Sequence, residues 1–582
     1  MSAASDFDSA GLPSLIDLLL SEQQSLPAVD TFARRHAEGE LSSVSDVYEE
    51  RIGIEIAGLR AGQQLAFRVD LDACTGCKAC VTACHSMNGL AEDETWRDVG
   101  LLVGVGAETG AAIEPEVGAA GEFVASGGFQ QTVTTACHHC EDPACLAGCP
   151  VLAYEKDPVT GIVRHLDDQC IGCQYCILKC PYDVPKYSAE LGIVRKCDMC
   201  TGRLAVGESP ACVQGCPNGA ISIEVVDAIA NDSSAELLAG MDGLLPDSSY
   251  TRPTTRYVSD RRATTLKPAG VDRLSPGHAH DPLSFMLVML QLSVGTLGFG
   301  MAASMLGLMT EPAMAFCYVM AAGTGILGLA AATLHLGRPM YAFRAFLGWR
   351  TSWMSREIIV VGLYVPAIVM TAVASLVLQF AERVEPGWVD VAKAGIAVLP
   401  VMSLLAGVVG IGCSMMIYVD TRRRAWSLAR TSTLFIGTLL GLGAMGAGTA
   451  LVLDAAIAGE SVAAGSIPLF GLGLLVLGMK LRIEKRLLES GKNSATRSIA
   501  LVRGAQLMRG PLRVRARARL FFAGVGMAGA AFSIALLAMG DGGSTGLLLT
   551  MAGGSLLLCT AGEIVERHLY FTAEASPGMP GH

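Results

Sequence analysis

The chain has 582 residues, too many for one hydrophobic core, and its formal net charge of -11 argues against nucleic-acid binding. Hydrophobic residues make up 51% and charged residues 17% of the sequence, and the mean hydropathy is +0.44. This average combines a polar first half with a strongly apolar second half, so the composition predicts a soluble region followed by a membrane region.

The first residues predict an N-terminal helical extension, 1–64. Within it, leucines recur at helical spacing in PSLIDLLLSEQQSLPAVDTFARRH, which predicts a helix that packs locally or on another subunit. Residues 1–60 contain no continuous apolar run, and Arg34 and Arg35 lie in a polar context. We therefore expect no secretory or twin-arginine signal.

Residues 65–226 alternate short β-type runs with cysteine loops, which predicts a soluble domain. A Gly- and Glu-rich insert interrupts it at about 93–132. The segment VGVGAETG in this insert is expected to be a loop, because no convincing βαβ unit surrounds it. Residues 227–280 are rich in Ser, Asp, Pro and Thr without sustained periodicity, and predict a linker or a strap over the soluble domain.

Residues 281–574 contain eight apolar stretches, and residues 575–582 form a tail. Most stretches reach the ~20 residues that a membrane span needs, and their Gly and Ala content favours close helix packing. Charged residues are nearly absent from the expected spans, with Gln291 as the main polar exception. The sixth stretch is the shortest. The spans are expected at about 283–309, 313–335, 358–380, 394–418, 433–457, 465–481, 520–539 and 545–564.

The loops predict an orientation. Those after the second, fourth and sixth spans lie on the same side as the N-terminal domain and hold 4, 4 and 12 Lys plus Arg, whereas the opposite loops hold only Arg383 and Lys393. The positive-inside rule then puts the soluble domain in the cytoplasm, at a bacterial inner membrane. The long sixth loop weighs less, but the remaining loops point the same way.

Sixteen of the 19 cysteines lie between Cys74 and Cys216, mostly two residues apart, which favours metal binding over disulfides. The run CIGCQYCILKCP has the C-x2-C-x2-C-x3-C-P spacing of bacterial ferredoxins, in which the fourth cysteine serves a second cluster. Four such motifs predict four 4Fe-4S clusters. The predicted ligands are Cys74, Cys77, Cys80 and Cys84; Cys137, Cys140, Cys145 and Cys149; Cys170, Cys173, Cys176 and Cys180; and Cys197, Cys200, Cys212 and Cys216.

Zinc is the alternative for paired cysteines. A zinc site usually takes its four thiolates from two separated CxxC knuckles. Here the motifs run four in a row, and three of them end in Cys-Pro, at Pro150, Pro181 and Pro217. That pattern favours iron-sulfur clusters.

The order and spacing of these motifs, including the wide gap in KCDMCTGRLAVGESPACVQGCP, resemble the four-cluster electron-transfer subunit of the DMSO reductase and nitrate reductase family of molybdoenzymes. The resemblance implies an α+β double-ferredoxin-like domain whose motifs exchange their fourth cysteines. Cys74, Cys77 and Cys80 would then share a cluster with Cys216; Cys197, Cys200 and Cys212 with Cys84; Cys137, Cys140 and Cys145 with Cys180; and Cys170, Cys173 and Cys176 with Cys149.

The membrane half has only two histidines, His335 and His568, too few for the four axial ligands of a two-haem cytochrome b, so we expect no haem. What remains is direct contact with a quinone. His335 and Glu357 both fall at the membrane boundary on the cluster side, where they can accept the protons of quinol oxidation. Arg338 or Arg356 can hold a developing oxyanion. A boundary residue with no role in chemistry is the alternative for each of them.

The segments LHLGRP, SREI and GEIVERHLYF resemble the haem-free anchor subunit of DMSO reductases, an eight-helix menaquinol-oxidising protein. The resemblance implies that His335 and Glu357 belong to a quinol site and that the partners are membrane lipid, the quinone pool and a molybdopterin-containing catalytic subunit. Glu563, Arg567 and Tyr570 match a less informative terminal motif.

Together these patterns predict a cluster domain followed by an all-α eight-helix transmembrane bundle, which oxidises quinol and passes electrons to a separate catalytic subunit. Two alternatives stay open: a redox-coupled ion-translocating module, and a passive membrane tether for the clusters. The family's best-known arrangement faces the periplasm, which is the alternative to the cytoplasmic orientation.

Overall fold

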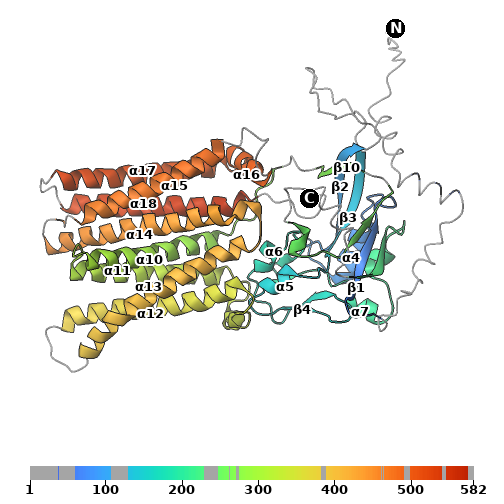
Figure 1. The fold of residues 1–582 in the computed structure, drawn as a ribbon, viewed down its shortest axis with the longest axis horizontal. Helices are drawn as coiled ribbons and strands as arrows, with labels where there is room; N and C mark the ends of the chain where they lie inside the picture. Colours follow the sequence, from blue (N-terminus) through green and yellow to red (C-terminus); the bar gives the residue numbers. More distant parts are fainter. Residues whose placement is uncertain are drawn as a thin grey trace, which may run out of the picture.

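The computed structural model shows two bodies joined end to end, a soluble body and a bundle of long helices (Figure 1). Almost all of the predicted N-terminal extension and the whole predicted tail lie outside the described residues. The structure describes residues 59–92, 94–106, 129–227, 247–260, 263–269, 274–381, 389–459, 465–489, 499–539 and 545–574, and singly 30, 34, 37 and 462.

A three-stranded sheet joins the two ends of the cysteine-rich region. Its central strand β1 (Gln63–Asp70) pairs antiparallel with β8 (Ile221–Asp227) along its whole length and parallel with β9 (Arg256–Val258). Leu65 and Phe67 point from β1 into the cysteine-rich core. The pairing holds the first and fourth cysteine motifs close together, because each motif lies directly next to one of the two long strands.

A second sheet contains β2 (Asp98–Gly106) between β3 (Phe129–Thr135) and β10 (Ala263–Pro268). The expectation of a loop for VGVGAETG is therefore wrong in its first half, since residues 103–106 belong to β2 and pair with β3 or β10. The alternating Val and Gly residues of this strand follow a β pattern that the glycines obscured in the sequence.

Short elements fill the rest of the soluble body. Two hairpins and five helices lie between the cysteine loops: β4 (Tyr154–Lys156) with β5 (Val163–His165), β6 (Lys186–Ser188) with β7 (Ile193–Arg195), α4 (Ala79–Asn88), α5 (Ala144–Gly148), α6 (Tyr175–Lys179), α7 (Thr201–Ala205) and α8 (Ala211–Gln214). With small sheets and short helices around the cysteines, the α+β ferredoxin-like prediction is confirmed.

The described part of the predicted linker acts as a strap over the soluble body. It forms the short 3-10 helix η2 (Ser248–Tyr250) and then strands β9 and β10, each of which adds to one of the two sheets. Sequence patterns missed these strands because both are short edge strands. The Tyr250 hydroxyl also donates to the backbone oxygen of Asp420 (2.8 Å), which ties the strap to the helix bundle.

Among the residues that the structure describes, eight helices are long and apolar enough to cross a membrane, as predicted. The sixth contains the shortest candidate span, 21 residues. The helices are α10 (Asp281–Met305), α11 (Glu311–Leu334), α12 (Trp353–Ala381), α13 (Val389–Val419), α14 (Leu428–Ala458), α15 (Ser466–Glu489), α17 (Arg513–Ala538) and α18 (Thr545–Thr572). Between α15 and α17, α16 (Ile499–Arg509) lies near the end of the bundle that faces the soluble body (Figure 1).

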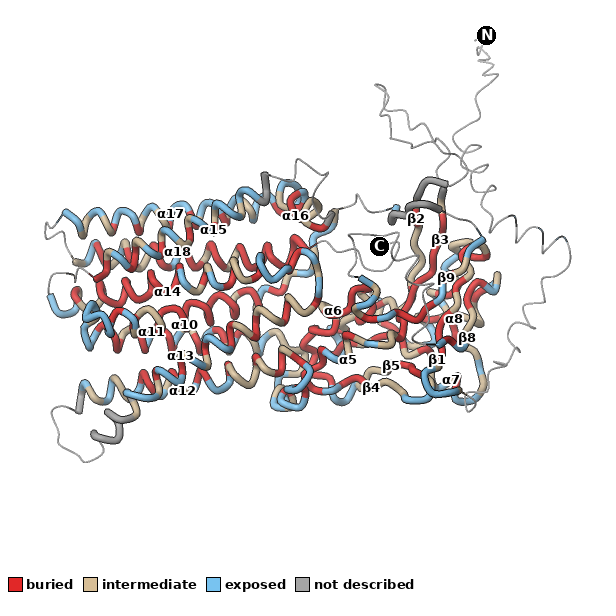
Figure 2. The backbone as a smooth tube through the Cα atoms, in the orientation of Figure 1, coloured by how far each residue is buried: buried red, intermediate tan, exposed pale blue. Residues whose placement is uncertain are grey.

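Helices α10 and α14 form the centre of the bundle, and both are buried along most of their length (Figure 2). They approach closely at Gly295 and Gly443, where a Cβ on Gly295 would lie 2.8 Å from the Gly443 Cα. Small residues permit such contact between helix backbones, which is a main source of packing energy in lipid. The outer helices, such as α17, expose more apolar surface, as expected for a lipid-facing position.

Candidate functional site

Two cavities in the soluble body are each surrounded by four cysteines. One is lined by Cys74, Cys77, Cys80 and Cys216, and the other by Cys137, Cys140, Cys145 and Cys180. In each, three thiols come from one motif and the fourth from another, which is the exchange that the family resemblance implied. Such an enclosed, thiol-lined cavity matches what a cubic iron-sulfur cluster needs.

The other eight cysteines form two further sets. Burial and the neighbouring Cys212 and Cys200 raise the pKa of Cys84 to about 12, and burial and the neighbouring Cys149 and Cys170 raise the pKa of Cys173. Buried thiols crowded in this way repel one another as anions, so a positively charged metal core stabilises them. The donor sets therefore fit iron-sulfur clusters.

The thiols converge because of a repeated backbone feature. Each motif has a non-glycine residue with left-handed backbone next to a cysteine: Lys78 (φ 61°), His139 (φ 43°), Gln174 (φ 60°) and Met199 (φ 59°). Lys78 and Gln174 directly precede helices α4 and α6. A left-handed residue is uncommon outside glycine and reverses the chain sharply, which turns successive thiols toward one cavity.

Two buried cations that no sequence pattern indicated lie between the cysteine sets. Arg97 donates to Thr134 (3.1 Å), and Lys196 lies 3.7 Å from the Cys137 sulfur and donates to the Cys197 backbone oxygen (2.8 Å). Burial opposes the charge of Arg97, but the surrounding thiolates, Cys212 and Cys80 first, raise its pKa. Both cations offset negative charge next to the cluster positions. The only sequence signal was their place near a cysteine motif.

The helix bundle docks on the loops that carry Cys149 and Cys170. The Gly348 amide donates to the Pro150 oxygen (2.8 Å), the Arg338 amide to the Ile171 oxygen (3.0 Å), and Ser352 Oγ to the Gly148 oxygen (2.7 Å). The segment between α11 and α12, which includes the 3-10 helix η3 (Pro339–Phe346), thus packs directly against two cysteine loops. One cysteine set is therefore next to the membrane bundle.

Glu357 lies on α12, 7% exposed, and accepts a hydrogen bond from Ser414 of α13. No other hydrogen bond or ion pair to its carboxylate is found among the described residues. The carboxylate also affects Tyr175, the residue before Cys176. Burial is the main cause that raises the pKa of the Tyr175 phenol, and the charges of Asp420, Tyr250 and Glu357 raise it further. The predicted acidic residue is thus buried within the bundle, close enough to a cysteine loop to affect Tyr175.

His335 follows the last turn of α11 and begins a row of three histidines. Its ring lies 5.2 Å from that of His280, which lies 4.7 Å from that of His278. Burial, and to a lesser extent the charge of His278, lowers the pKa of His335 to about 4. Burial, and to a lesser extent the charge of His335, lowers the pKa of His280 to about 3. His280 is buried and His278 is exposed, so the row runs outward to solvent. The pattern His-x-His before the first span was the missed signal.

The structure does not bring the four predicted site residues, His335, Glu357, Arg338 and Arg356, together in one cluster. Within the described residues, no hydrogen bond, ion pair or ring contact joins His335 to Glu357. Arg338 donates to the backbone oxygens of Asp167 (3.0 Å) and Leu191 (3.3 Å), and Arg356 donates to those of Trp349 (3.0 Å) and Arg350 (2.8 Å). Both guanidinium groups are thus engaged with backbone.

Charged side chains meet inside the bundle near the ends of the expected spans. Glu563 of α18 is 1% exposed and pairs with Lys480 of α15 and, at 2.7 Å, with Arg519 of α17. Glu566 and Glu484 extend this ion network. Lys480 and Glu563 are at the ends of expected spans and the other three charges lie just beyond them, and the observed helices extend past those limits.

The other two residues of the terminal motif pack with aromatic rings. Arg567 is fully buried, with its guanidinium 4.0 Å from the Phe435 ring centre and a hydrogen bond to Gln291 (3.3 Å). Tyr570 stacks on Trp426 at 5.6 Å with an interplanar angle of 19°. The motif therefore forms part of the bundle interior.

The fold and the cysteine cavities define a multi-pass membrane protein with an iron-sulfur domain. Two family models match the chain: "4Fe-4S dicluster domain" over residues 129–226 and "DMSO reductase anchor subunit (DmsC)" over residues 275–572. The chain belongs to the DMSO reductase anchor family and unites the anchor with an iron-sulfur electron-transfer domain.

Curated relatives resemble the iron-sulfur part. The sequence is 34% identical over 196 residues to the probable anaerobic dimethyl sulfoxide reductase chain YnfG of Escherichia coli, covering 33% of this protein and 86% of the relative. It is 32% identical over 191 residues to an anaerobic dimethyl sulfoxide reductase chain of Haemophilus influenzae, covering 33% and 87%.

A third relative is the iron-sulfur subunit of the nitrate-inducible formate dehydrogenase of Escherichia coli, at 37% identity over 161 residues, which covers 27% of this protein and 53% of the relative. All three relatives are named as chains or subunits of larger enzymes.

Proposed function

We propose that the chain oxidises quinol at the membrane boundary and delivers the electrons to a separate molybdopterin-containing catalytic subunit. When bound, the clusters accept and release single electrons. We assign four 4Fe-4S clusters to the four cysteine sets: Cys74, Cys77, Cys80 and Cys216; Cys84, Cys197, Cys200 and Cys212; Cys137, Cys140, Cys145 and Cys180; and Cys149, Cys170, Cys173 and Cys176.

The observation that carries this proposal is the docking of the segment between His335 and Glu357 on the loops of Cys149 and Cys170. The Glu357 carboxylate accepts a quinol hydroxyl proton, since Ser414 is its only described partner. His335 accepts the other proton and passes it through His280 to the exposed His278. We assign positioning roles to Arg338 and Arg356, because both hold backbone oxygens.

The test is quinol-driven bleaching of cluster absorbance in the purified full chain under anaerobic conditions, with a soluble naphthoquinol as donor. Glu357→Gln or His335→Gln should slow the reaction about 100-fold, the usual contribution of a positioned acid or base. Glu311→Gln is the matched control, because Glu311 is exposed at the opposite end of α11. Equal rates in all variants contradict the proposed site and favour a passive tether.

The loop charges support a bacterial inner membrane with the soluble body on the cytoplasmic side. Reporter fusions to the loop between α12 and α13 test this: an enzyme active only in the periplasm should work there. Activity of the reporter in the loop between α11 and α12 instead would establish the periplasmic alternative for the soluble body.

One observation favours a second candidate function, redox-coupled ion translocation. The network around Glu563 places five charged side chains inside the bundle, and buried ionisable residues often mark ion paths. Proteoliposomes distinguish the two functions: translocation requires an acid or alkaline shift in the lumen during quinol oxidation that Glu563→Gln abolishes, whereas simple quinol oxidation leaves no such dependence.

A further inference from the structure

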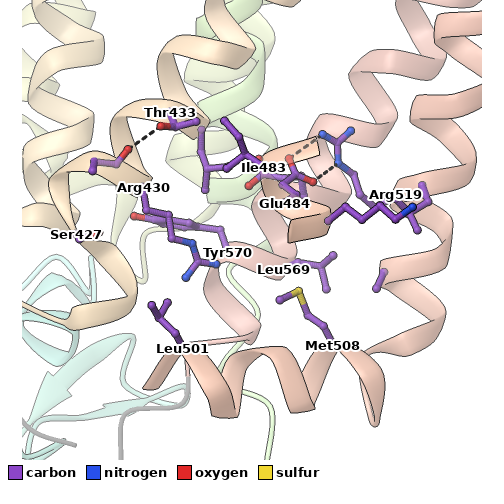
Figure 3. A pocket seen from close by; sticks show the side chains of 16 residues that line it. Ser427, Arg430, Thr433, Ile483, Glu484, Leu501, Met508, Arg519, Leu569 and Tyr570 are labelled. Carbon is purple, nitrogen blue, oxygen red and sulfur yellow. Dashed lines mark hydrogen bonds and ion pairs between the residues drawn. The ribbon is translucent and has the colours of Figure 1, made fainter. Parts of the chain in front are cut away.

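A cavity of about 320 Å³ lies among helices α14 to α18, and neither His335 nor Glu357 lines it. Helices α14, α15, α17 and α18 form its walls, and α16 closes it at the end near the soluble body (Figure 3). Leu501 and Met508 of α16 point into it. Its volume is within the range of small-molecule sites in proteins.

The cavity offers a free hydrogen-bond acceptor. Glu566 lines it and is only 6% exposed. Its Oε2 atom accepts from Lys480 (3.1 Å), but its Oε1 atom has no hydrogen-bond partner among the described residues. A carboxylate oxygen that lacks a protein donor can accept a hydrogen bond from a ligand hydroxyl.

The wall holds three cations, Arg430, Lys485 and Arg519, and two carboxylates, Glu484 and Glu566, so its charges nearly balance. Arg519 is already neutralised, since it pairs with Glu484 (3.1 Å) and Glu563 (2.7 Å). Arg430 donates with one nitrogen to the Ala425 oxygen (3.1 Å), which leaves its others for a ligand oxygen. Carboxylates Glu484 and Glu566 would repel a lipid phosphate. The site therefore suits a neutral molecule that carries both a hydroxyl donor and an oxygen acceptor.

The rest of the wall suits an aromatic ring with an apolar tail. Leu434, Leu501, Met508 and Leu569 line the cavity. Ile483 and Leu520 also line it, and they are 42% and 44% exposed on the lipid-facing side of the bundle. A tail can therefore leave the cavity between α15 and α17 into the membrane.

Aromatic and polar contacts connect this cavity to a cysteine set. Tyr570, in its wall, stacks on Trp426 at 5.6 Å. The Arg423 guanidinium lies 5.4 Å from the Trp426 ring centre and donates to the Cys180 backbone oxygen (3.4 Å). Such a connection suits a redox-active ligand.

We propose that this cavity is a second binding site for the head group of a membrane quinol, with its hydroxyl on Glu566 Oε1 and its other oxygen on Arg430. The inference rests on the proposed function for the class of ligand, but the two sites have no residue in common. Binding at one can therefore be lost without loss at the other.

The experiment is photolabelling of the purified full chain in phosphatidylcholine nanodiscs with an azido-naphthoquinone, followed by peptide mass spectrometry. Two labelled regions are expected: one between residues 335 and 357, and a second on α14, α16 or the end of α18. Leu501→Trp fills the cavity and should lower the second labelling about tenfold. Labelling between 335 and 357 stays unchanged and shows that the variant is folded. Glu566→Gln, which removes the charge but not the shape, should lower the second labelling as well.

Leu475→Trp is the matched control, since Leu475 on α15 is 60% exposed and does not line the cavity. Labelling confined to 335–357, or second labelling that Leu501→Trp leaves intact, overturns the second site while the proposed function stands. Labelling of the second region alone refutes the His335–Glu357 site and supports this one. A co-purified phospholipid that Leu501→Trp displaces and the naphthoquinone does not would also overturn it, because the cavity would then be a lipid site.

Discussion

Gly348→Ala tests whether backbone contact between the helix bundle and the Cys149 loop is essential. A Cβ at this position would lie 2.7 Å from the Cys149 oxygen and 2.8 Å from the Pro150 oxygen. These are backbone atoms that no rotamer change can move, so the two bodies must separate slightly. The Gly348 amide would then lose its 2.8 Å bond to Pro150.

The expected cost is the sum of two effects. The lost hydrogen bond contributes about 1 kcal/mol net, and overpacking in a close-packed region costs about 1–3 kcal/mol. We therefore expect the free energy of unfolding to fall by about 2–4 kcal/mol. Quinol-driven bleaching of cluster absorbance should slow in parallel, because the Cys149 set no longer sits firmly on the bundle.

Gly362→Ala in α12 is the control, because a Cβ there meets nothing within 4 Å. Alanine is favoured over glycine inside a helix by about 1 kcal/mol, so this variant should be at least as stable as the parent. Detergent-solubilised protein can be followed by circular dichroism in a denaturant series and by anaerobic stopped-flow absorbance. If Gly348→Ala matches Gly362→Ala in both measurements, the reasoning about the docking contact is refuted.

Three further predictions address single side chains. Glu563→Gln leaves Lys480 and Arg519 buried without their shared carboxylate and should lower the free energy of unfolding in denaturant by about 3–5 kcal/mol. Glu155→Gln, which breaks a half-exposed ion pair, should lower it by no more than about 1 kcal/mol. Similar losses in the two variants would contradict the burial argument. The pKa of His280 is about 3 in the folded protein, and its ordinary value is 6.5. Between pH 6.5 and 3, therefore, His280 binds a proton only in the unfolded state. The free energy of unfolding consequently falls as the pH falls below 6.5. His280→Gln should reduce the loss between pH 8 and 5 by about 2 kcal/mol, and an unchanged pH profile would show that His280 is not desolvated. Lys196→Met removes a buried cation 3.7 Å from the Cys137 sulfur and should lower the reduction potential of the nearest cluster by roughly 50–100 mV in a redox titration; a potential that stays the same or rises would rule out the electrostatic role.

Local sequence patterns were sufficient to predict the cluster domain, the count of spans and the family resemblance. Ligand spacing within a motif is local, so CIGCQYCILKCP indicates its chemistry without a fold. Span number is equally local, because a bilayer crossing needs only a sufficiently long apolar run. Position at the membrane boundary was enough to single out His335 and Glu357 as candidates, although not to show what each of them contacts.

Which charged residues meet became clear only from the packed helices. Lys480, Arg519 and Glu563 come from three different helices. In the sequence, Lys480 and Arg519 looked like loop charges, and Glu563 stood at the end of the last expected span. Their pairing depends on helix rotation and tilt, which packing between helices sets. The same holds for Glu566 and its cavity, and for the contact of Gly348 with Pro150, since each joins segments far apart in the chain. Long-range proximity of this kind leaves no local pattern to detect.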